Sequence, residues 1–172
     1  TGVLERAKRD HPMSFDIQSL KEISSSLLRL AKEARKCCDL DSLRGYEGEA
    51  ASLYFSVFDH LILQNKKIFS FKQRMKRPPK DSVNALLSFC YTILANDCAS
   101  ALEAVGLDAY VGFLHRDRPG RISLALDLME ELRSIYADRF VLTLINNRKI
   151  NASAFERQEN GAVLLNLSLI HI

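Results

Sequence analysis

The sequence is poor in the residues that interrupt helices and close tight turns. Its 172 residues include only seven glycines and four prolines, and no tryptophan. A sandwich or barrel needs a turn about every 8–12 residues, and such turns draw heavily on glycine and proline. Helical periodicity runs through nearly the whole chain instead. The sequence therefore predicts an all-α fold, and its length suits one domain.

Long apolar runs and paired cysteines are also missing. The chain contains no run of 18 apolar residues, so a membrane span is not expected. Four cysteines are present but form no C-x-x-C pair, which disfavours zinc and disulfide frameworks: Cys37, Cys38, Cys90 and Cys98. We expect reduced core or surface thiols in a cytosolic protein. There is no signal peptide, and the chain begins with Thr1 rather than Met, as a fragment would.

Five helices are expected. Ser14 or Asp16 caps the first, which runs to about residue 36, and its apolar stripe is Leu20, Ile23, Leu27, Leu30 and Ala34. Asp39 or Asp41 opens the second, in which the candidates for burial are Leu43, Ala50, Ala51, Tyr54, Phe55, Phe58 and Leu61. Asp81 caps the third, 83–105, which Gly106 ends. This third helix is apolar on more than one face, so it is expected at the centre of the domain.

The C-terminal third of the chain continues this pattern and then weakens. Ser123 is expected to cap a fourth helix, with a core face of Leu124, Leu128, Leu132 and Ile135. A fifth helix covers about 137–145. The remainder, about 147–172, is expected to hold a short hairpin or irregular structure.

Basic residues gather between the second and third helices. The net charge is only +3, but residues 65–80 hold seven lysines and arginines and no acid. Pro78 and Pro79 exclude helix there, so an exposed loop is expected. Such a loop can hold a phosphate backbone through Arg74, Lys76 and Arg77, with Phe69 or Phe71 stacking on bases. It can equally be a solvated linker, and composition does not decide between the two.

A carboxylate falls within the apolar stripe of the second helix. On a helical wheel, Glu47 shares a face with Leu43, Ala51, Tyr54 and Phe58. A buried carboxylate is costly unless it meets a cation or takes up a proton. Glu47 is therefore either a functional group or an edge residue that pairs with a lysine or arginine.

A histidine precedes a run of acids near residue 120. His115 is followed by Arg116, Arg118 and Arg121, and then by the acids Asp127 and Glu130. Two acids three residues apart on a helix can approach one point. They form either a solvated acidic face or part of a metal site.

One imidazole with carboxylates suits Mn²⁺ or Mg²⁺. Neighbouring arginines suit phosphate oxygens, so together the residues fit metal-assisted chemistry at a phosphodiester. Zinc proteolysis fits worse, because H-E-x-x-H is absent.

Three stretches together resemble a known family. They are RGYEGEAASLYF, RPPKDSVNALLSFCYTIL and ALEAVGLDAYVGFLHRDRPGRISLALDLMEELR. In order and spacing they are similar to the CRISPR-associated spacer-acquisition integrases, which are also endonucleases, from about residue 6 to residue 166. The three stretches resemble those of the subtype I-C branch.

The resemblance implies a helical catalytic domain over 1–166, with an atypical tail over 167–172 and without the family's N-terminal β-domain. It implies that Glu47, His115 and Glu130 are metal ligands for Mg²⁺ or Mn²⁺, that Asp127 assists beside them, and that Asn84 supports the site. It also implies double-stranded and branched DNA as substrates, a small companion subunit, and a homodimer in full-length members.

The implied reaction joins a DNA 3′-hydroxyl to a repeat phosphodiester, and DNA cleavage accompanies it. The rival hypothesis is a non-enzymatic helical domain that binds DNA or another partner. The two differ in whether Glu47 and His115 lie together in the fold or across it from one another.

Overall fold

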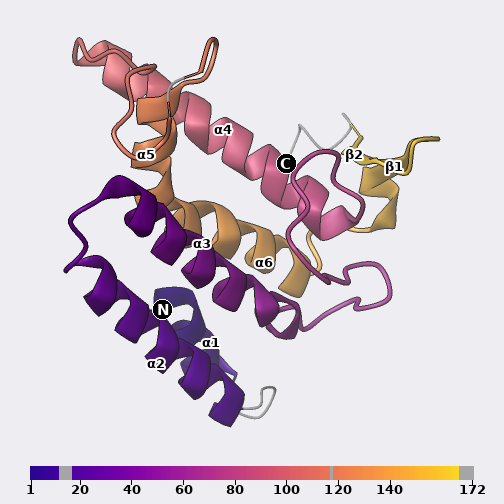
Figure 1. Ribbon diagram of the computed structural model, residues 1–172. Coiled ribbons are helices and arrows are strands. Elements are labelled where there is room, and N and C mark those ends of the chain that lie inside the picture. Colours follow the sequence, from indigo (N-terminus) through magenta and orange to yellow (C-terminus); the bar gives the residue numbers. More distant parts are fainter. Residues whose placement is uncertain (12–16, 117, 167–172) are drawn as a thin grey trace.

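Helices account for most of the regular structure (Figure 1). The structure is a computed structural model that describes residues 1–11, 17–116 and 118–166. Its long helices are α1 (Gly2–Asp10), α2 (Ile17–Ala34), α3 (Leu40–Ser56), α4 (Ser82–Ala104), α5 (Ser123–Arg133) and α6 (Arg139–Asn146). The short elements are η1 (Phe58–Leu61), η2 (Ser134–Asp138), η3 (Ala152–Ala154), β1 (Phe155–Arg157) and β2 (Val163–Leu165). The all-α prediction is confirmed, and the expected hairpin is the antiparallel pair β1–β2.

Two of the expected helix starts are capped by aspartate side chains. The carboxylate of Asp39 accepts a hydrogen bond from the Ser42 amide at the start of α3, and that of Asp81 accepts one from the Asn84 amide at the start of α4. Gly106, at φ 81°, follows the end of α4. The proposed caps Ser14 and Asp16 lie outside the described residues. Helix α1 is an element that the sequence analysis did not predict.

The expected cap of α5 is wrong. Ser123 is the first residue of α5 and makes no capping hydrogen bond. The free amides of Leu124 and Ala125 donate instead to the carbonyl oxygen of Ala109, at 3.0 and 3.3 Å. A distant backbone carbonyl thus replaces the local cap.

The helices enclose two cores of unequal size. Helices α2 and α3 lie side by side, and α4 packs against α5, η2 and α6 (Figure 1). The large core includes Phe58, Phe69, Leu87, Val141 and Ile145. The small core lies between α4 and α5 and consists mainly of compact side chains: Ala95, Cys98, Leu102, Ala109, Ala125 and Met129.

The expected core face of α5 is confirmed in part, because Leu124 and Leu132 pack against the small core but the other two predicted residues do not. Ala125 and Met129 are buried, whereas Leu128 is 37% exposed and Ile135 is 52% exposed. Ile135 lies in the π-helical segment η2, which changes the angular register after α5. At Leu128 the reason is that α5 turns Asp127, rather than its leucines, toward the loop before it.

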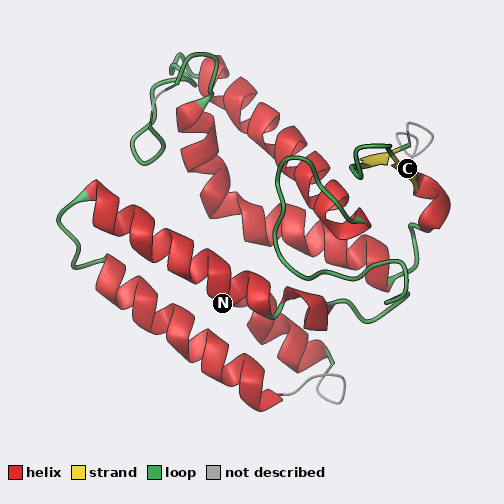
Figure 2. Ribbon diagram, turned by 45° about the vertical axis from the view of Figure 1, so that its right-hand side comes forward, coloured by secondary structure: helices red, strands yellow, loops and turns green. Residues whose placement is uncertain are grey.

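The basic loop 62–81 is anchored in the domain and is not a free linker. It runs from η1 to the start of α4 (Figure 2). Phe69 is fully buried and Phe71 is 4% exposed, and the amide of Phe71 donates to Asp59 Oδ1 at 2.7 Å. Neither ring is available to stack on a nucleic-acid base, so that expectation is wrong. The phenylalanines fix the loop, and most of its cations remain exposed.

Helix α4 is long and apolar enough to cross a membrane by length and composition alone. The central helix of a folded domain passes the same test. Nine of its side chains are buried, and it contacts α5, η2, α6 and β2. The packing therefore favours the central position that the sequence predicts. The cysteines are free as expected, and burial raises the pKa of the Cys90 thiol to about 11.

Asn84 joins α4 to the basic loop and generates the first prediction. Its side chain is fully buried; Oδ1 accepts from Met75 N and Arg74 Nη1, and Nδ2 donates to Gln73 O and Asp81 Oδ2. We expect Asn84→Ala to lower the free energy of unfolding by about 2–3 kcal/mol, because it strands buried polar groups. Urea unfolding measures this.

The matched control is Asn96→Ala, on the exposed side of the same helix. It is expected to change stability by less than about 0.5 kcal/mol. Equal effects of the two variants would show that the Asn84 network is not stabilising.

Candidate active site

A polar cleft of about 680 Å³ contains the three residues proposed as metal ligands. Glu47 comes from the middle of α3, His115 from the loop between α4 and α5, and Glu130 from α5. Side chains far apart in the sequence thus line one cavity. The sequence alone left open whether Glu47 lies across the fold from His115, and it does not.

The Asp127 carboxylate fixes the loop that carries His115. Its Oδ2 accepts hydrogen bonds from the amides of Phe113 and Leu114 at 2.6 and 3.0 Å. Its Oδ1 accepts a hydrogen bond from the amide of His115 at 2.9 Å and contacts His115 Nδ1 at 2.6 Å. Burial works against the charge of Asp127, but these hydrogen bonds outweigh it and hold the pKa of Asp127 below its usual value.

This contact orients the imidazole. An ionised carboxylate only accepts hydrogen bonds, so Nδ1 of His115 is the donor to Asp127. In the neutral ring Nε2 then carries the free lone pair. A carboxylate behind a histidine in this way is the usual support of a metal-ligating histidine. Asp127 is therefore a positioning residue, with both oxygens occupied by the loop.

Close packing of the loop on α5 depends on Gly112. A Cβ atom at this position would lie 2.6 Å from Ser123 Cβ and 3.0 Å from Asp127 Oδ2. The first distance is shorter than any normal contact. A side chain at position 112 would thus push the loop away from the carboxylate that holds it.

A second set of contacts ties α3 to the same loop. Arg44 donates from Nε to the carbonyl oxygen of Leu114 at 2.8 Å and from Nη1 to Asp41 at 2.6 Å. Arg116 reaches the same oxygen of Asp41 at 2.9 Å. These bonds hold α3, and with it Glu47, beside the loop that carries His115.

The two glutamates of the cleft differ in their partners. Glu130 is paired with Arg133, with 2.7 Å between Oε1 and Nη1. Burial raises the pKa of Glu130, Arg133 opposes that rise, and the negative charge of Glu47 adds to it. The half-buried Glu47 makes no hydrogen bond or ion pair within the described ranges 1–11, 17–116 and 118–166. The interpretation of Glu47 as one half of a surface ion pair is therefore wrong.

The donor types in the cleft suit Mg²⁺ or Mn²⁺. An oriented imidazole and an unpaired carboxylate share the cleft with a second carboxylate. In the arrangement described, no three His, Cys, Asp or Glu side chains are close enough to hold a metal ion, as far as the described residues go. Of the two glutamates, Glu130 is the one that an arginine holds.

Cations surround the acids. Of the residues proposed for nucleic-acid binding, Arg74 and Lys76 line the cleft. Arg77 and Arg118 are exposed, as is Arg116, and Arg121 is half-exposed; none of the four is among the cleft-lining residues described. Lys72, from the basic run 65–80, also lines the cleft, and the sequence analysis missed two further cations of the lining, Arg44 and Arg133. The spacing of three between Glu130 and Arg133 on one helix was the available signal.

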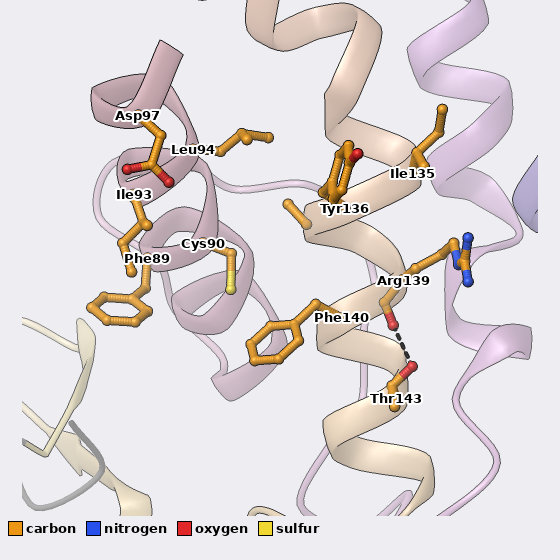
Figure 3. Close-up of a pocket in the computed structure, with 11 residues that line it drawn as sticks. Phe89, Cys90, Ile93, Leu94, Asp97, Ile135, Tyr136, Arg139, Phe140 and Thr143 are labelled. Atoms are coloured by element: carbon orange, nitrogen blue, oxygen red, sulfur yellow. Dashed lines mark hydrogen bonds between the residues drawn. The ribbon is translucent and has the colours of Figure 1, made fainter. Parts of the chain in front are cut away.

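A second hollow lies between α4 and the helical stretch η2–α6 (Figure 3). It is about 670 Å³ in volume, with Phe89 and Ile93 facing Tyr136 and Phe140 across it. Asp97 is the one carboxylate in its described lining. This hollow is mainly apolar and lacks the mixture of acids, imidazole and cations found in the first cleft.

These features define a helical domain with a histidine and two glutamates in one cationic cleft. The family described as CRISPR associated protein Cas1 matches residues 1–171. The chain belongs to the Cas1 family, which confirms the resemblance at the level of the family.

Relatives and solved structures agree. The chain is 55% identical over 168 residues to CRISPR-associated endonuclease Cas1 2 of Rhodospirillum rubrum, covering 95% of the chain and 49% of the relative. It is 46% identical over 165 residues to CRISPR-associated endonuclease Cas1 of Leptospira interrogans, covering 96% and 65%. The Cas1 structure from Thermotoga maritima superposes with a TM-score of 0.77 at 30% identity, covering 97% of this chain and 52% of that one.

A casposase bound to integration product superposes with a TM-score of 0.79 at 30% identity, covering 96% of this chain and 44% of that one. The chain thus spans about half the length of several of these proteins.

Substitution of Gly112 tests the packing of the loop. We expect Gly112→Ala to lower the free energy of unfolding by about 1–3 kcal/mol, because the added Cβ collides with Ser123. Chemical denaturation measures the change. Gly45→Ala, at an exposed site in α3 with open space around it, is expected to stabilise by about 0.5–1 kcal/mol. A stabilising effect at both sites would contradict the described loop position.

Asp127→Asn tests the orientation of the imidazole. In the unchanged chain we expect neutral His115 to carry its proton on Nδ1, because Nδ1 contacts Asp127 Oδ1. The variant is expected to populate both tautomers, which nitrogen NMR of the ring distinguishes. The exposed His60 supplies an internal reference. An unchanged His115 spectrum in the variant would show that Asp127 does not set the tautomer.

Proposed function

We propose that this chain is the catalytic part of a metal-dependent DNA endonuclease and integrase of CRISPR adaptation. It would join a DNA 3′-hydroxyl to a phosphodiester of the repeat and would also cleave DNA. The observation that carries the proposal is the meeting of Glu47, His115 and Glu130 in one cleft lined by cations. The endonuclease names of the relatives and the integration product named with the casposase support it.

Each residue of the cleft has a part in the proposed reaction. His115, aimed by Asp127, and the two glutamates would hold Mg²⁺ or Mn²⁺. When bound, such an ion stabilises charge on the phosphate and on the departing oxygen. Lys72 and Lys76 attract the phosphate into the cleft. The arrangement of side chains would set the line of attack by a hydroxyl or by water.

The nucleic-acid contacts divide into two groups. Arg74 is pinned by hydrogen bonds to Asn84 and Ser88, so it supplies a fixed charge at the cleft wall. The exposed Arg77, Arg116 and Arg118, together with Arg121, would contact phosphates farther out. Such contacts give affinity without reading sequence, and duplex or branched DNA offers the phosphates.

The wider assembly forms part of the same proposal. Two similar solved structures are named as complexes of Cas1 with Cas2, which supports a small companion subunit. A homodimer of the full-length protein, a subtype I-C origin and a prokaryotic cytoplasmic location complete it.

The test compares each proposed ligand with an exposed acid on the same helix. We expect Glu47→Gln and Glu130→Gln to weaken Mn²⁺ binding by the chain at least about tenfold. Glu49→Gln and Glu131→Gln, at exposed positions, should leave it unchanged. Isothermal titration measures the binding. The same four variants, with His115→Ala, are then compared in Mn²⁺-dependent cleavage of branched DNA, in which loss at the three ligand positions alone is expected.

Two results would decide against the proposal. Full activity of Glu47→Gln or His115→Ala in a full-length form of the protein would remove the assigned ligands. Binding of branched DNA by this chain with no Mn²⁺ binding would favour the rival, a non-enzymatic DNA-binding module.

A further inference from the structure

The cation that holds Glu130 lies in the cleft and belongs to the same helix. Arg133 Nη1 is 2.7 Å from Glu130 Oε1, and the two side chains are 18% and 21% exposed. Neither group is deeply buried, but both are largely shielded from water. The direct attraction between the two charges is larger in such surroundings than at the surface, and breaking the pair leaves two charges that need new partners.

Arg133 has a second hold that does not involve Glu130. Its guanidinium carbon lies 5.5 Å from the centre of the Tyr91 ring. The Tyr91 hydroxyl donates to Asp138 Oδ1 at 2.5 Å, and Asp138 is fully buried. This hydrogen bond fixes the aromatic ring in place, and a cation over the face of the ring is attracted to it. Arg133 would remain in the cleft if Glu130 left it.

The same ring also carries Arg74, at 5.2 Å from its centre. Two guanidinium groups near one ring repel each other, so a nearby anion stabilises each of them. Burial raises the pKa of Asp138, and both arginines oppose that rise. Glu130 is the carboxylate that pairs with Arg133 in the arrangement described. A phosphate would serve Arg133 equally well.

A divalent cation bound by Glu130 would compete directly with Arg133. Both are positive, both seek the same carboxylate, and like charges at a few ångströms repel strongly in a shielded cleft. The two partners of Glu130 are therefore alternatives. When Glu130 binds the metal, Arg133 would remain over Tyr91 without its carboxylate partner, facing the cleft that the phosphate enters.

We propose that Arg133 is an exchangeable counter-ion: it neutralises Glu130 before the metal binds, and it is then released to bind the substrate phosphate. The inference rests on the proposed function and names a residue that acts in it. Metal binding and phosphate binding would thereby be coupled, because each makes the other more favourable.

Arg133→Gln and Arg133→Met test the exchange, with Met keeping the unbranched stem without its charge. We expect both to bind Mn²⁺ roughly five- to twentyfold more tightly than the unchanged chain, because a competing cation is gone. Electron paramagnetic resonance of free Mn²⁺ measures the affinity. Arg157→Gln, which removes the same charge from the exposed end of β1, should have no effect.

The coupling supplies a second readout. Fluorescence anisotropy with branched DNA should show that Mn²⁺ tightens DNA binding by the unchanged chain, and that both Arg133 variants lose most of this gain. Arg133→Lys, which keeps the charge, should retain part of it. Circular dichroism checks that each variant is folded.

The possible failures are distinguishable. If the unchanged chain shows no Glu47-dependent Mn²⁺ binding, the proposed function fails and this inference fails with it. If the chain binds Mn²⁺ but the folded Arg133 variants bind it no more tightly, the inference alone is overturned. Retention of the full Mn²⁺-dependent gain in DNA affinity by both variants would also overturn it.

Discussion

The site depends on one carboxylate that lies behind it. The Asp127 carboxylate accepts hydrogen bonds from three backbone amides and one imidazole nitrogen of the loop segment 113–115. These four hydrogen bonds fix the position of the loop over α5 and the orientation of the His115 ring. The cost of burying Asp127 is met by these hydrogen bonds, and the loop gains a defined shape in return. Gly112, which must approach α5 closely, is a consequence of the same arrangement.

Local signals in the sequence predicted much of the fold. Asp39 and Asp81 cap helices because a short carboxylate can reach back to the free amides of a first turn, and Gly106 ends α4 through its positive φ. Both rules need only a few neighbouring residues. The central place of α4 followed from its apolar composition. The meeting of Glu47 with His115 came from the family resemblance, since no local pattern joins positions 68 residues apart.

The errors have a common physical cause, which is contact between distant segments. The amides at the start of α5 are satisfied by Ala109 and not by Ser123. Phe69 and Phe71 interrupt a basic run, yet they fill the core beneath it. The helical periodicity of α5 predicted Leu128 and Ile135 in the core. That periodicity contains no information on the hydrogen bonds between Asp127 and the loop, or on the π-helical segment η2 that follows α5. The sequence gives no sign that the Tyr91 ring contacts cations, because the two arginines over it come from two other parts of the chain.

The division into two cores has a consequence for the geometry of the cleft. The large core holds η1, α6 and much of α4 around aromatic and branched side chains, whereas the small core beneath α5 rests on alanines, one cysteine and a few longer chains. Among the described residues, the small core has fewer buried members than the large core, so less apolar area is removed from water there. His115 and Glu130 belong to the part of the chain that packs around the small core, whereas Glu47 lies on α3, whose C-terminal aromatic residues pack against the large core. The boundary between the two cores therefore runs through the cleft, and the relative position of the three side chains depends on how the two cores pack against each other.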